Sequence, residues 1–86
     1  MSNEECPFKS GVRYRVRADI SELGHSFSAG EFVVFIRWAY DAHNGVSRFW
    51  FSKEGTDKMD VWHVWDNEAS ASEQWSRYFE EAPEKE

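Results

Sequence analysis

The chain has 86 residues, a net charge of −6 and an aromatic content of 17%. This length allows one domain, and the aromatic content excludes a disordered chain because each ring can bury on the order of 150–250 Å². The two ends, residues 1–6 and 80–86, carry −5 of the net charge. The body is therefore nearly neutral and lacks the broad basic surface typical of nucleic-acid-binding proteins.

A single cysteine, Cys6, excludes an intramolecular disulfide and fits a reducing compartment. The start of the chain has no basic segment followed by an apolar one, and no run reaches the length of a membrane span. We therefore expect a cytoplasmic protein without a membrane segment. Residues 1–7 are polar and are expected to form a loose arm.

Residues 11–19, GVRYRVRAD, alternate between apolar and charged side chains, which predicts a strand with one face in solvent. The charged face holds Arg13, Arg15 and Arg17, and it has two interpretations. The stripe could bind nucleic acid, or it could be a solvated face whose arginines pair across strands with acids such as Glu31. The second interpretation is favoured.

Residues 19–30 carry no sustained hydrophobic period, so they predict a long connection. Ile20, Leu23 and Phe27 would pack this segment against the body, and a short irregular strand is expected near residues 26–28. Connections of about twelve residues are uncommon in compact domains and are often functional.

The stretch 31–41, EFVVFIRWAYD, is the densest apolar run of the chain. At a period of two, one face would be an unbroken apolar stripe, which we expect to face the core. This face comprises Phe32, Val34, Ile36, Trp38 and Tyr40. At roughly 3.3 Å per residue the run would span about 35 Å, so we expect it to bend and serve two parts of a sheet. Val33 and Phe35 on the second face predict partial coverage there as well.

Asn44 and Gly45 separate two strand-like runs and predict a hairpin, because both residues tolerate positive φ. The returning strand is expected at residues 46–52. A polar turn follows it, and the next strand is expected at about residues 60–65, with apolar side chains on both faces.

The period then changes to that of a helix, predicted over residues 67–82. Ser70 and Glu73 have the spacing of a capping box, and Pro83 ends the helix. The large apolar side chains of the helix must dock on the sheet or on a second copy of the chain. They are Trp75, Tyr78 and Phe79. An acidic tail, residues 83–86, follows.

These elements predict a single domain, mainly β, with a small antiparallel barrel of four or five strands over residues 8–66 and a C-terminal amphipathic helix. Three motifs resemble those of a bacterial family of small SH3-like domains of unknown function. They are Gly11-x-x-Tyr14-x-Val16 before a long loop, Gly30-Glu31 before an aromatic strand, and the later Trp62-His63-Val64-Trp65. The resemblance implies a fold, with ligands bound between the long first loop and the hairpin loops, but no activity.

The residues that could perform catalysis or bind a metal do not have the required spacing. Cys6, His25, His43 and His63 match no zinc pattern, and neither a nucleophile elbow nor a phosphate-binding loop is present. We therefore expect no metal, no cofactor and no enzymatic activity.

The aromatic residues exceed what a small core needs, which predicts a non-enzymatic domain that binds a protein or peptide through exposed rings beside the long first loop. Exposed rings near acidic residues would suit a proline-rich or cationic ligand. The candidates are Tyr14, Trp38, Tyr40, Trp50, Trp62 and Trp65. For each single ring, a place in the core is the competing interpretation. The alternative functions are self-association through the C-terminal helix, weak nucleic-acid binding through the arginine stripe, and a small inhibitor or immunity-type protein.

Overall fold

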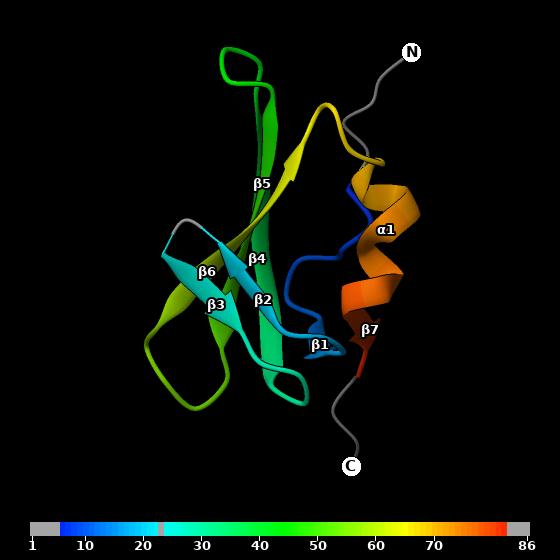
Figure 1. Cartoon of the computed structure of the whole chain (residues 1–86). Coiled ribbons are helices and arrows are strands. Elements are labelled where there is room, and N and C mark those ends of the chain that lie inside the picture. Colours follow the sequence, from blue (N-terminus) through cyan, green and yellow to red (C-terminus); the bar gives the residue numbers. More distant parts are fainter. Residues whose placement is uncertain (1–5, 23, 83–86) are drawn as a thin grey trace.

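Seven strands and one helix lie along the residues that the computed structural model describes, 6–22 and 24–82 (Figure 1). In chain order they are β1 (Arg13–Val16), β2 (Ile20–Glu22), β3 (His25–Phe27), β4 (Phe32–Asp41), β5 (Val46–Lys53), β6 (Met59–Trp65), α1 (Ala71–Tyr78) and β7 (Phe79–Glu81). Most of the arm expected at 1–7, and the whole acidic tail at 83–86, lie outside the described residues.

Five strands form one antiparallel sheet in the order β6-β5-β4-β1-β7, and β2 and β3 form a separate hairpin. The expected mainly β fold with antiparallel pairing is confirmed. Among the described strands, β6 and β7 end the order and are not paired with each other. The helix packs against one side of the sheet, and the β2–β3 hairpin lies on that side as well (Figure 1).

The prediction that the face of Phe32, Val34 and Ile36 points to the core is wrong for the first half of β4. Val33 and Phe35, on the other face, are buried there instead. The pairing with β5 shifts register between Phe35 and Arg37, so Ile36 is an extra residue at a bulge. One extra residue exchanges the two faces of a strand, which brings Trp38 to the buried side opposite Phe49. The first half of β4 pairs with both β1 and β5, as the length of the run predicts.

Phe8 lies at the centre of the core, before the first strand, and is 5% exposed. Its ring contacts seven other aromatic rings at centroid distances of 5.0–5.8 Å. These rings belong to Tyr14, Phe35, Phe49, Phe51, Trp62, Trp75 and Phe79. Cys6 also packs against this core, so the loose arm does not extend to residue 7. Such edge-to-face packing of aromatic rings adds to the free energy gained by burial.

The helix is shorter than the predicted span of 67–82, because the chain becomes extended at Phe79 and pairs with β1. The side chain of Ser70 forms no cap hydrogen bond, so the expected capping box is not made. Trp75 contacts Phe8, and Tyr78 contacts Trp62. Phe79 stacks on Phe51 at 4.8 Å. The three apolar side chains of the helix region therefore dock on the sheet of the same chain.

Candidate binding cleft

The tip of the β4–β5 hairpin is fixed by the carboxylate of Asp41. It accepts hydrogen bonds from the backbone N–H of His43 and of Asn44, from Asn44 Nδ2 at 2.8 Å and from Arg48 Nη1 at 3.1 Å. The bonds from Asn44 and Arg48 lower the pKa of Asp41 to about 2. The tip is therefore a preformed turn with a carboxylate that stays ionised.

The end of β6 presents an exposed indole beside a tight turn. Trp65 is 36% exposed, and its ring stacks on that of His63 at a centroid distance of 6.2 Å. Its backbone N–H donates to Glu68 Oε1 at 3.1 Å, and its carbonyl accepts from the N–H of Glu68 at 2.9 Å. This double contact holds the Glu68 carboxylate next to the strand.

The hairpin tip and the end of β6 meet through Asp66. The hydroxyl of Tyr40 donates to Asp66 Oδ2 at 2.7 Å, and the N–H of Asp66 donates to the carbonyl of Gly45 at 2.9 Å. Gly45 has a φ of +66°, and a Cβ at this position would lie 3.1 Å from Asp66 Oδ2. The positive φ favours a glycine here, and an added Cβ would also require the Asp66 carboxylate to shift slightly.

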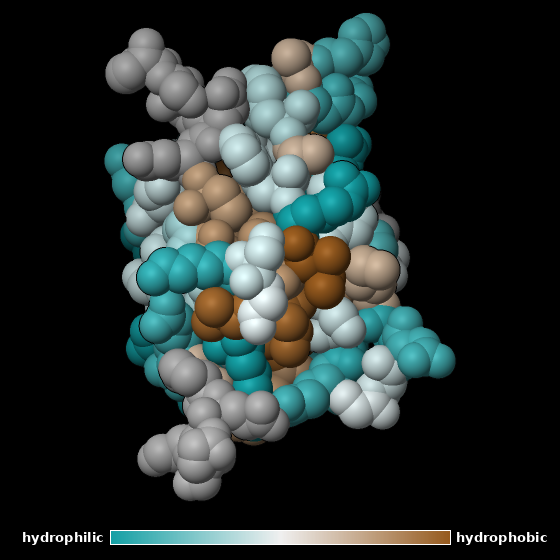
Figure 2. Space-filling view, turned by 180° about the vertical axis from the view of Figure 1, so that it is seen from behind, coloured by the Kyte–Doolittle hydropathy of each residue, from teal (hydrophilic) through white to brown (hydrophobic). Residues whose placement is uncertain are grey.

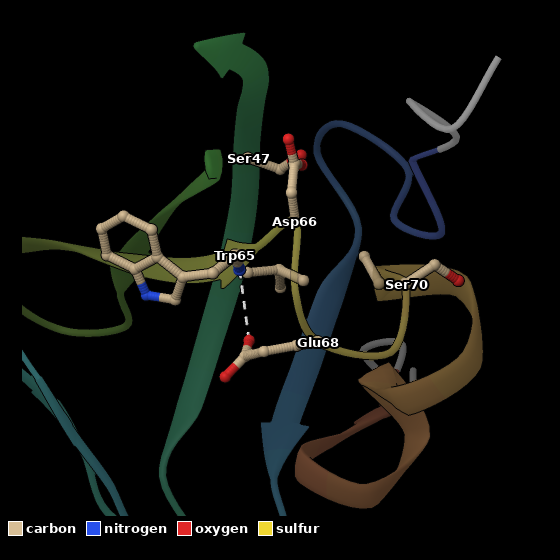
Figure 3. Close-up of a pocket in the computed structure, with 7 residues that line it drawn as sticks. Ser47, Trp65, Asp66, Glu68 and Ser70 are labelled. Carbon is tan, nitrogen blue, oxygen red and sulfur yellow. Dashed lines mark hydrogen bonds between the residues drawn. The ribbon is translucent and has the colours of Figure 1, made fainter. Parts of the chain in front are cut away.

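A depression of about 360 Å³ opens between these segments and the start of α1. Figure 3 shows the indole of Trp65 on one side of it and Ser70 on the other, with Asp66 and Glu68 between them. Its lining residues are Ser47, Val64, Trp65, Asp66, Glu68, Ser70 and Ala71. A second depression shares Trp65, Asp66 and Glu68 and extends to the hairpin tip. We call the two together the Trp65 cleft.

The lining of the Trp65 cleft combines an indole with two carboxylates, and it contains no basic side chain. An electron-rich ring beside acidic groups attracts a lysine or arginine side chain through both cation–π and ionic contacts. The cleft is open to solvent and has small polar side chains at its rim, which suits a segment of a polypeptide. Chemically, the arrangement is one for recognition of a cation.

The structure separates the six aromatic candidates into three groups. Tyr14 and Trp62 are 0% and 3% exposed, so both belong to the core and not to a binding surface. Trp38 is half-buried and stacks on Phe49, and Trp50 is half-buried on the opposite face of the sheet. Tyr40 and Trp65 are exposed. Trp65 lines the cleft, and Tyr40 does not line it but bonds to its residue Asp66.

Sequence reasoning missed the two carboxylates of the cleft. Neither Asp66 nor Glu68 was among the residues predicted to bind a ligand. The signal that could have found them is an acidic turn directly after a tryptophan-rich strand, because the end of a strand leaves its last side chains at the surface.

Comparisons with known protein families, with curated proteins and with solved structures found no match for this chain. The resemblance to a bacterial SH3-like family therefore stays a prediction.

Two pairs of a histidine and a carboxylate connect the β2–β3 hairpin to β6, next to the cleft. His25 Nδ1 lies 3.0 Å from Asp60 Oδ1, and His63 Nδ1 lies 3.2 Å from Glu22 Oε2. Burial lowers the pKa of His63, which Glu22 only partly offsets. Burial would raise the pKa of Asp60, but hydrogen bonds from His25 and Lys53 outweigh it and lower the value. The long first connection is thus fixed beside the cleft.

The arginine stripe is largely engaged by other groups. Arg13 pairs with Glu54 at 3.1 Å, Arg15 pairs with Glu80 at 2.9 Å, and Arg17 donates to the carbonyl of Ser76. The prediction that Glu31 pairs with these arginines was wrong, since its carboxylate pairs with Lys53. The solvated face with cross-strand pairing is the interpretation that these contacts fit.

The opposite face of the sheet is apolar in its middle. Seen from behind, an apolar group occupies the centre of the molecule, with hydrophilic side chains around it (Figure 2). Ile36 at the bulge is 40% exposed, and the guanidinium of Arg37 lies 4.0 Å from the ring centroid of Trp50. The ring of Trp50 is therefore already covered by a cation of its own chain.

The chemistry of the remaining candidates is limited. Within residues 6–22 and 24–82, no three His, Cys, Asp or Glu side chains are grouped closely enough to hold a metal ion. Burial raises the pKa of the Cys6 thiol, which donates to the carbonyl of Phe8 at 3.4 Å. In the described part of the chain, no helix has the length and apolarity needed to cross a membrane.

Proposed function

We propose that this chain is a non-enzymatic, cytoplasmic interaction domain that binds a cationic segment of a partner protein at the Trp65 cleft. The observation that carries the proposal is the exposed indole of Trp65 next to the carboxylates of Asp66 and Glu68, in a cleft lined by no basic side chain. A lysine or arginine placed over the indole would gain about 0.5–2 kcal/mol from the cation–π contact alone.

The strand order supports an SH3-like barrel as the finer description of the fold. The sheet runs β7-β1-β4-β5-β6, with a long connection after β1, and this arrangement is compatible with the predicted resemblance. The Trp65 cleft lies between the β4–β5 hairpin tip and the connection from β6 to α1, and the β2–β3 hairpin adjoins β6. A ligand between the long first loop and a hairpin loop is what the resemblance implies.

Nucleic-acid binding is the less favoured alternative, because Arg13 and Arg15 are already paired with Glu54 and Glu80. Self-association through the helix is also less favoured, because Trp75 and Phe79 contact rings of their own chain. The raised pKa of Cys6 disfavours a nucleophilic thiolate, in line with a non-enzymatic role.

The test combines capture of partners from the native host with calorimetric titration of short lysine- and arginine-containing peptides. We expect Trp65→Ala to weaken binding at least about twofold, since it removes the cation–π partner. Trp50→Ala is the matched control, because it makes the same change at an indole that lies outside the cleft and is already covered by Arg37.

Equal binding by wild type and Trp65→Ala would contradict the proposed site. Loss of binding in Trp50→Ala alone would move the site from the Trp65 cleft to the surface around Trp50.

A further inference from the structure

Strand β6 ends the five-stranded sheet, so every second backbone N–H group along it points away from the sheet. In an antiparallel ladder, alternate residues bond toward the neighbouring strand and toward the edge. The N–H of Asp66 donates to the carbonyl of Gly45 in the connection to β5, so the N–H groups of Trp65 and His63 face outward. At these two residues β6 therefore pairs with no other strand of the part of the chain that the structure describes.

Side-chain carboxylates occupy both outward N–H groups. His63 donates to Glu22 Oε2 at 2.7 Å, and Trp65 donates to Glu68 Oε1 at 3.1 Å. The two acceptors are spaced as the carbonyls of a neighbouring strand would be, two residues apart. Glu22 is half-buried and Glu68 is exposed, so both carboxylates can move aside without breaking a ladder of the sheet.

There is space along this edge. A depression of about 240 Å³ lies between β2 and α1 and is lined by Glu22, His63, Glu68 and Tyr78, among others. Glu68 also lines the Trp65 cleft, so the depression and the cleft follow the same edge of β6. An extended chain passing along the edge would meet both.

We propose that the edge of β6 at His63 and Trp65 accepts an extended, cationic segment of a partner protein as an additional strand. The carbonyls of the segment replace the carboxylates of Glu22 and Glu68, which then pair with its lysine or arginine side chains. This inference rests on the proposed function and specifies the conformation of the bound segment.

The charges along the edge select this occupant. Asp19, Glu22 and Glu68 line the depression, and Asp66 lines the adjoining cleft. A second copy of the chain would bring its own net charge of −6 to an acidic edge, which opposes pairing of the edge with itself. An acidic or neutral segment would leave the displaced carboxylates without a partner.

The first experiment records amide spectra of the ¹⁵N-labelled full chain with an acetylated, amidated pentapeptide of alternating lysine and valine. We expect the largest shift changes at His63 and Trp65, with slower hydrogen exchange at both. The same peptide methylated on every internal backbone nitrogen keeps its charge but cannot pair as a strand. It should bind at least about tenfold more weakly, since each main-chain bond contributes to affinity.

The second experiment removes the carboxylates with Glu22→Ala/Glu68→Ala and uses a neutral pentapeptide of alternating threonine and valine. We expect this variant to bind the neutral peptide at least about threefold more tightly than wild type, because no carboxylate competes for the edge. The control Asp57→Ala/Glu73→Ala makes the same change of charge at exposed positions and should bind it as wild type does.

The outcomes separate the inference from the proposed function. Equal binding of the cationic peptide and its methylated form, with shifts at Trp65 and Asp66 but not at His63, overturns the strand addition and leaves the cleft in place. If no cationic peptide binds wild type, the proposed function fails. In that case the Glu22→Ala/Glu68→Ala variant still tests whether the edge accepts a strand. If this variant does not bind the neutral peptide, the inference is overturned.

Discussion

Trp62 and Trp65 lie three residues apart on the same strand, yet their surroundings have little in common. Trp62 is 3% exposed and contacts the rings of Phe8 and Phe79, among others. Trp65 is 36% exposed, stacks on His63 and borders two carboxylates. The difference shows that one ring is enclosed by other rings and stabilises the fold, whereas the other stays accessible to solvent beside two carboxylates.

The cause of this difference is the alternation of side chains along a strand. Residues at even positions of β6 face the core, and residues at odd positions face the other side. Trp62 opposes Phe49, whereas Trp65 opposes Val46 near the hairpin tip. The same residue type therefore lies in the core or at the surface according to its parity and its distance from the core.

The largest expected effect comes from truncating each tryptophan in turn. Trp62→Ala should lower the free energy of unfolding by about 3–5 kcal/mol, because it removes a buried ring from the centre of the core. Trp65→Ala should lower it by less than about 1 kcal/mol, because this ring is largely at the surface. Urea unfolding followed by circular dichroism measures both values. An equal loss of unfolding free energy in the two variants would contradict the placement of Trp62 in the core and Trp65 at the surface.

A smaller effect is expected at Gly45, which supports the wall of the cleft. Gly45→Ala should cost about 1–2 kcal/mol for the positive φ. Its Cβ would additionally press on the Asp66 carboxylate. Gly55 has a φ of +84°, and there is open space around a Cβ added to it. Gly55→Ala therefore measures the cost of the backbone conformation alone. Thermal unfolding of both variants compares these losses of stability. If Gly45→Ala loses no more stability than Gly55→Ala, the Asp66 carboxylate moves aside without cost.

The smallest effect concerns the pH dependence of the hairpin tip. The pKa of Asp41 is about 2 in the folded chain, below its ordinary value of 3.8. The folded state therefore keeps this group ionised where the unfolded state takes up a proton. Its contribution to stability is complete above about pH 4 and is lost as the pH falls through 2.

Denaturant unfolding between pH 5 and pH 2 tests this contribution. Asp41→Asn should be less stable than wild type at pH 5, and the difference should shrink toward pH 2. Asp57→Asn is the control with the same change of charge in an exposed turn. A difference that stays constant with pH would assign the effect to packing rather than to charge.

Local signals in the sequence were sufficient for the hairpin and for the strands on either side of it. The Asn44–Gly45 pair and the alternating runs around it depend on near neighbours, and β5 and β6 lie where those runs predict them. The bulge at Ile36 could not be predicted. In a run that is apolar on both faces, the sequence does not tell which alternate residues face the core. The β2–β3 hairpin was underestimated for a similar reason, since its strands are too short to show a period.

The last strand was missed because its pairing is non-local. Phe79 continues the helical spacing of Trp75, and only its contact with β1 makes the extended backbone favourable. The Trp65 cleft was predictable in part: Tyr40 and Trp65 were named, but Asp66 reaches them only through the geometry of the turn after β6.

The position of β7 has a consequence for how the domain is completed during synthesis. Residues 79–81 leave the ribosome after every other strand of the sheet, and they pair with residues 14–16 near the beginning. Until then, one side of β1 has no neighbour, and Phe79 is absent from the ring cluster. The nascent chain must therefore hold an incomplete sheet, and closure over so many residues favours slow folding.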